Sequence, residues 1–124
     1  MHEMIKKKFE RMDKEALAKI EMKEIDEILR RAHEVMTDSF RPKFGKGLRS
    51  RPGNRQERQA AANDVDLILS EIPCIDDEIR VDIVRISDFT RMGNSLTGNF
   101  FGPLRNKCER KISDAKKWLK DNPN

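Results

Sequence analysis

The chain has 124 residues, 39% of them charged and 36% hydrophobic, and a formal net charge of +4. This length predicts one domain over residues 1–124, with a modest core, because its charged fraction exceeds the roughly 25% usual in globular domains. The basic N-terminus lacks the apolar stretch of a signal peptide and no apolar run approaches the ~20 residues that span a bilayer, so we expect a cytoplasmic protein with no membrane contact.

Residues 1–38 are predicted to form one long amphipathic helix that neither Gly nor Pro interrupts. Asp13 is a candidate N-cap, so a break near residues 12–14 is the alternative. We expect this helix to pack within the chain, while contact with a protein partner or a homodimer through residues 5–36 is the second interpretation, because the spacing is not a clean heptad. The apolar residues recur every three or four positions and indicate one stripe: Ile5, Phe9, Met12, Ala16, Ile20, Ile25, Ile28, Leu29, Ala32, Val35 and Met36.

Residues 41–54 are predicted to be a flexible basic loop, because their prolines and glycines exclude a continuous helix. From residue 41 to residue 58 the chain carries seven basic side chains against the single acid Glu57. Dispersed cations, glycines and the aromatic Phe44 suit a nucleic-acid backbone, since each neutralised phosphate releases counterions. The alternative is a solvated connector. The predicted phosphate contacts here are Arg41, Lys43, Lys46, Arg49, Arg51, Arg55 and Arg58.

A second helix is predicted from the N-cap Asn54 to about Ser70, with Pro73 marking its end. In the next segment, residues 79–84 alternate like a short strand, but Ile79, Ile83, Ile86 and Phe89 also fit a helix. We favour the helix, because a lone strand would have no partner to pair with. The consecutive acids at 76–78 suit a helix N-terminus through its dipole.

Residues 86–100 resemble a degenerate helix-turn-helix, with a turn at Gly93. In that arrangement Ser95, Thr97 and Asn99 would face a nucleic-acid groove, and Arg105 and Lys107 would bind phosphate. Gly98 and Pro103 fall where the recognition helix should run, so a plain helix–loop–helix corner is the favoured interpretation.

The last helix is predicted over residues 103–120, with Gly102 as its cap and Pro103 at its first position. It is basic from residue 105 onward. One face is apolar and should pack on the core, with Trp118 beside it; this face comprises Leu104, Cys108, Ile112, Ala115 and Leu119.

No residue pattern predicts catalysis, a metal site or a cofactor. His2 and His33 are far apart, and Cys74 and Cys108 have no zinc-ligand spacing, so neither a zinc site nor a nucleophilic triad is predicted. We expect the two cysteines to be buried thiols, with one disulfide as the alternative.

The sequence therefore predicts an all-α, non-enzymatic protein that binds DNA or RNA through the 41–58 segment and the basic C-terminal helix. The alternative is a protein–protein interaction module, an adaptor or inhibitor, that uses the long helix and the acidic stretch at 63–82. A metal-dependent nuclease-like enzyme built on the central acids ranks third. Nucleic-acid binding requires the two basic segments to share one face, whereas the adaptor requires an exposed apolar patch along residues 5–36.

Overall fold

The protein is all-α, as predicted. The computed structural model describes residues 2–40, 43–44, 50–51 and 54–123. A two-residue antiparallel ladder, in which Lys43 pairs with Arg51, interrupts the segment predicted to be entirely loop. In chain order the elements are α1 (His2–Ala18), α2 (Met22–Phe40), β1 (Lys43–Phe44), β2 (Ser50–Arg51), α3 (Arg55–Leu69), α4 (Asp77–Met92), the 3₁₀ helix η1 (Ser95–Phe100) and α5 (Phe101–Asp121).

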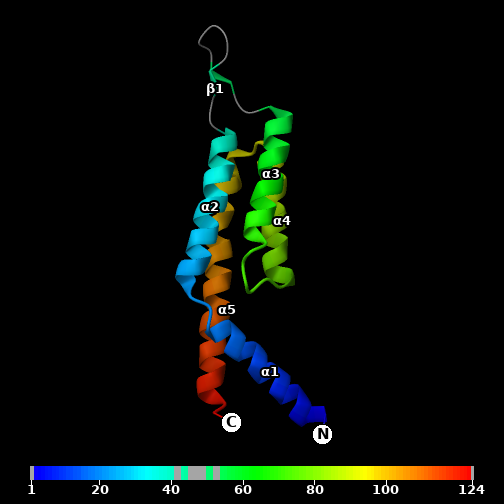
Figure 1. Ribbon diagram of the computed structural model, residues 1–124, viewed down its shortest axis with the longest axis vertical. Coiled ribbons are helices and arrows are strands. Elements are labelled where there is room, and N and C mark those ends of the chain that lie inside the picture. The colour runs from blue at the N-terminus through cyan, green and yellow to red at the C-terminus, as the bar shows by residue number, and fades with distance from the viewer. Residues whose placement is uncertain (1, 41–42, 45–49, 52–53, 124) are drawn as a thin grey trace.

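Helices α2, α3, α4 and the first half of α5 run side by side along the long axis (Figure 1). The strands lie beyond one end of this bundle, between α2 and α3. Helix α5 continues past the other end, where α1 packs on it and both chain termini lie. No helix in the described part of the chain is long and apolar enough to span a bilayer.

Apolar side chains from α2, α3, α4 and α5 meet in one core. Each helix contributes residues at spacings of three and four, which places them on a single face. Leu17, Ile20 and Met22, at the junction of α1 and α2, pack partly buried against this core. The innermost apolar side chains, all essentially inaccessible to solvent, are Ile25, Val65, Leu69, Ile79, Ile83, Ile86, Leu104 and Cys108.

The prediction of one long helix over residues 1–38 is wrong, because residues 19–21 separate α1 from α2. The turn is tight: the amide of Ile20 donates to the carbonyl oxygen of Leu17 at 3.1 Å. At about 100° per residue, a continuous helix would place Ile25 about 160° around the axis from Phe9. The two apolar stripes therefore lie on nearly opposite faces, and a single straight helix cannot turn both towards one core.

Helices α3 and α4 begin where the sequence predicted, whereas Gly102, predicted to cap the last helix, is the second residue of α5. Asn54 accepts a hydrogen bond from the amide of Glu57 at 2.8 Å, and Asp76 accepts one from the amide of Ile79 at 2.9 Å. The segment at 79–84 lies inside α4, so the strand alternative is wrong. Helix α5 begins two residues earlier than predicted, and Pro103 is its third residue, where its missing N–H leaves no intrahelical bond unmade.

One charged group is buried between α4 and α5. The side chain of Asp82 is 6% exposed, and its Oδ2 lies 2.8 Å from Lys107 Nζ, with Glu78 at 3.8 Å on the same ammonium. Asp82 Oδ2 has no hydrogen-bond partner among the described residues, so the pair is held by charge. An unpaired carboxylate at this position would be costly, because burial removes its hydration.

Replacing Lys107 by alanine should lower the free energy of unfolding by about 3 kcal/mol, because it leaves the buried carboxylate of Asp82 without a counter-ion. Urea denaturation followed by circular dichroism measures this, with Lys116→Ala as the exposed control, for which we expect less than about 0.5 kcal/mol. The double variant Asp82→Asn/Lys107→Met should recover much of the loss. Equal stabilities of Lys107→Ala and Lys116→Ala would contradict a structural role for the pair.

Candidate nucleic-acid interface

The acidic stretch and the basic C-terminal helix neutralise each other across the α4–α5 contact. Lys107 pairs with Asp82 and Glu78, and one helical turn further on Lys111 pairs with Asp76. The alternation of charge along the sequence is thus used, in this region, for contacts within the fold.

Arg105 is also held within the fold. Its Nε donates to Asp26 Oδ1 at 2.6 Å and its Nη2 to Asp26 Oδ2 at 3.2 Å, while Nη1 donates to Glu109 at 2.9 Å. The hydrogen bonds to Asp26 raise the pKa of Arg105 above its usual value. This pair ties α5 to α2 at the protein surface. Two of the predicted phosphate-binding residues, Arg105 and Lys107, therefore already have anionic partners inside the chain.

The structure does not contain the helix-turn-helix that was the alternative for residues 86–100. Helix α4 ends at Gly93, which has a positive φ of 70° and serves as the left-handed C-cap, and the segment that follows is a six-residue 3₁₀ helix. Thr97, expected to face a groove, is 0% exposed, and its hydroxyl donates to the carbonyl oxygen of Asn94 at 2.5 Å. Gly98 and Pro103 account for the absence of a regular recognition helix. The favoured plain corner is confirmed: Ser95 opens η1, and Asn99 is exposed near its end.

The bundle end that carries the two strands has described cations from two helices, α3 and α4. Arg55 is exposed at the first position of α3. Arg58 lies across the C-terminus of α4, where its Nε donates to the carbonyl oxygen of Arg91 at 3.2 Å. A cation is favourable at that position because the helix dipole leaves partial negative charge there. Arg91 itself pairs with Asp88 at 2.8 Å.

Two residues near this end were missed by the sequence analysis. Arg91 lies in the last turn of α4, and its position two residues before a C-capping glycine was the available signal. Arg85 lies over the ring of Phe100, with its guanidinium carbon 5.6 Å from the ring centroid, and Phe100 also stacks at a tilt on Phe89. Nothing in the spacing of these residues indicated the contact, because it depends on how η1 folds back on α4.

The predicted phosphate contacts on the 41–54 segment are placed only in part. Arg41, Lys46 and Arg49 lie outside the described residues, and Lys43 and Arg51 are described only as the backbone of paired strands. Of the remaining predicted contacts, Arg55 and Arg58 lie at the end of the bundle from which this segment leaves.

The predicted buried thiols are confirmed. Cys74 and Cys108 are both free and both buried. The interaction between the two thiols lowers the pKa of Cys74 and, together with burial, raises that of Cys108. His33 is exposed on α2, 5.2 Å edge-on from the ring of Phe101. Within the described residues, no three side chains of His, Cys, Asp or Glu converge to hold a metal ion.

No protein-family model, curated protein or solved structure matches this chain.

The lowered pKa of Asp76 predicts that the free energy of unfolding depends on pH. Burial raises its pKa, but hydrogen bonds from Lys111 and from the amide of Ile79 outweigh burial, so the pKa lies below its usual value. A lowered folded-state pKa contributes stability above the unfolded pKa of about 3.9, and this contribution is lost as the pH falls through the folded pKa. Asp76→Asn keeps the cap and removes the charge, so its stability deficit at pH 7 should shrink below about pH 4.

Asp76→Ala removes the cap as well and should cost a further ~1 kcal/mol at every pH. Urea unfolding of both variants between pH 3 and pH 7 measures the two contributions separately. A deficit of Asp76→Asn that is the same at all pH values would contradict the assigned ion pair with Lys111.

Proposed function

We propose that this chain is a non-enzymatic nucleic-acid-binding protein whose interface is the end of the bundle that carries β1 and β2. The observation that carries the proposal is the location of the net charge. Residues 41–58 hold seven basic side chains and one acid, a net +6, whereas the whole chain is +4, so the remainder is net −2. All of the excess positive charge therefore belongs to the segment that begins at this end and returns to it.

The ion pairs elsewhere support the same assignment. Arg105, Lys107 and Lys111 are neutralised by acids of α2, α4 and α5, which leaves the middle of α5 with little net charge to offer a polyanion. The interface is accordingly smaller than the one predicted from the sequence. It omits Thr97, which is buried, and Arg105 and Lys107, which are paired with acids, and it retains Arg55 and Arg58.

The two basic segments do not form one continuous face, so the predicted interface that combines them is wrong and the proposal is confined to the strand-bearing end. The strands lie at one end of the long axis and the C-terminus of α5 at the other (Figure 1). A phosphate backbone that follows the strand-bearing end would therefore meet Arg55 and Arg58 together with the cations of residues 41–54, and not Lys116 to Lys120. An excess of cations at one end suits contact with the backbone of DNA or RNA, a mode without base readout.

The adaptor alternative retains one specific observation in its favour. It required an exposed apolar patch along residues 5–36; the α2 part of that stripe is buried in the core, but the α1 part is exposed. Three acids of the acidic stretch, its other predicted surface, are paired with cations of α5: Asp76, Glu78 and Asp82.

The proposal is tested by affinity for generic double- and single-stranded nucleic acid at several salt concentrations. For wild-type protein, log K should fall linearly with log salt, with a slope of about −0.9 per contacted phosphate on duplex DNA. The triple variant Arg49→Ala/Arg51→Ala/Arg55→Ala should bind about 10–100-fold more weakly near 0.1 M salt and lower the slope by about 3, with unchanged stability.

The matched control removes the same charge from the other end of the molecule, as Lys116→Ala/Lys117→Ala/Lys120→Ala. We expect this variant to bind with close to wild-type affinity. Equal losses of affinity in the two triple variants would show that binding depends on the net charge of the protein and not on the strand-bearing end. The absence of binding even at low salt would reject the function.

A further inference from the structure

Helix α1 turns a mixed side towards the rest of the chain and an apolar side towards solvent. The partly buried positions of α1 are Arg11, Lys14, Leu17 and Ala18, on the side that meets α5, and Arg11 Nη1 donates to the carbonyl oxygen of Asn122 at 2.5 Å. None of the α1 side chains that the structure describes is fully buried. The helix is thus attached by one mixed face, through Arg11 and Lys14 and through Leu17 and Ala18 near its C-terminal end.

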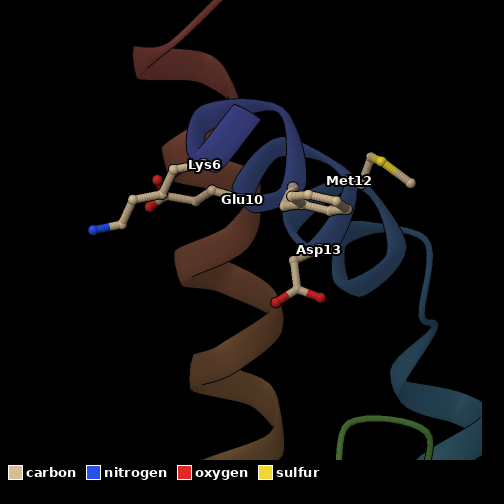
Figure 2. Close-up of a pocket in the computed structure, with 5 residues that line it drawn as sticks. Lys6, Glu10, Met12 and Asp13 are labelled. Carbon is tan, nitrogen blue, oxygen red and sulfur yellow. The ribbon is translucent and has the colours of Figure 1, made fainter. Parts of the chain in front are cut away.

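The opposite face is the N-terminal part of the predicted apolar stripe. Ile5, Phe9 and Met12 are 52%, 65% and 56% exposed, and Ala16 is exposed beside them. Around Phe9 and Met12 the surface forms a pocket whose other walls are Lys6, Glu10 and Asp13 (Figure 2). All five residues belong to α1, so the pocket has no opposing wall within the part of the chain that the structure describes. Such a pocket is the kind of hole into which a side chain of a second helix packs.

The spacing from Ile5 to Ala16 fits one specific kind of helix. Steps of four, three and four residues are those of alternating d and a positions in a heptad. The full stripe over residues 5–36 does not keep this spacing, and the structure divides it at residues 19–21. In this assignment Ile5 and Met12 are d positions, and Phe9 and Ala16 are a positions. Lys6 and Asp13 directly follow the two d positions. Lys8 and Glu15 directly precede the two a positions.

We propose that a second copy of this chain covers this face, with the two α1 helices packed antiparallel. In this arrangement Phe9 lies opposite Met12 of the second copy and Ile5 lies opposite Ala16. Each flank then faces the same flank of the second copy, so that Lys6 meets Asp13 and Lys8 meets Glu15. Symmetry makes each contact twice, which gives four pairs of opposite charge.

The charges on the flanks select this arrangement over the parallel one. Parallel helices would bring Lys8 to Asp13 of the second copy and leave Lys6 and Glu15 without a counterpart. Lys6, Lys8 and Asp13 are exposed and make no ion pair within the part of the chain that the structure describes, whereas Glu15 lies 3.3 Å from Arg11 of its own helix. Three of the four flanking charges are thus available to a second copy without breaking a contact.

The dimer should be weak, because one face of a helix of this length buries less area than stable dimers use; we expect a dissociation constant on the order of 10 μM. Sedimentation velocity over about two decades of concentration around that value measures it. Phe9→Glu should raise the dissociation constant at least about tenfold. The control Leu67→Glu alters a leucine of α3 that is 68% exposed and should leave it unchanged.

A charge-exchange experiment tests the antiparallel register. Lys6→Asp alone and Asp13→Lys alone place like charges opposite each other, and each should weaken self-association about tenfold. An equimolar mixture of the two variants restores opposite charges at both contacts and should associate like the wild type, as should the double variant. Circular dichroism of each variant verifies that the helices are intact.

Several results would overturn the proposal. Wild-type protein that remains monomeric through the whole concentration range excludes the dimer, and so does Phe9→Glu that associates as the wild type does. Insensitivity to Lys6→Asp excludes the antiparallel register. A monomer that binds vesicles of anionic phospholipid through Phe9, and loses this binding in Phe9→Glu, would assign the face to a membrane surface instead.

Discussion

A helix can bury only one face against one core, and the apolar residues of the first forty positions lie on two. Those of α2 face the bundle, and those of α1 would point away from it if the helix continued. The turn at residues 19–21 resolves this conflict only in part: it lets Leu17, Ile20 and Met22 reach the core, while Ile5, Phe9 and Met12 stay exposed. The rest of the bundle closes without α1, and α1 is left with an exposed apolar surface.

Charge is distributed by an equally simple rule. Where α4 and α5 come into contact, acids of one helix meet cations of the other, and a buried carboxylate at Asp82 requires Lys107 beside it. Such a pair contributes less to net stability than its Coulomb attraction, because both groups lose hydration, but it disfavours any packing that would leave Asp82 unpaired. The cations of residues 41–58 have only Glu57 among them, so the net charge of the molecule is concentrated at one end.

The sequence was sufficient for features that depend on neighbouring residues. The caps at Asn54 and Asp76, the buried face of α5 and the all-α class follow from local spacing and local hydrogen bonding. The phase difference between Phe9 and Ile25 was also present in the sequence, but spacings of three and four look continuous unless the angle is summed along the helix. The partners of Arg105 and Lys107 were not predictable in this way, because Asp26 and Asp82 approach them only through the packing of distant helices.

The two surfaces lie at opposite ends of the molecule, and this arrangement determines how they would work together. Helix α1 joins the bundle at the end away from β1 and β2 (Figure 1). Pairing through α1 would therefore leave both strand-bearing ends open and carry them on one particle. Two weak, salt-sensitive contacts on a common particle act on a long polyanion with a raised effective concentration, so that avidity can exceed the affinity of either end without any new contact. A small interface at each end is then compatible with useful binding, because the second contact becomes intramolecular once the first has formed.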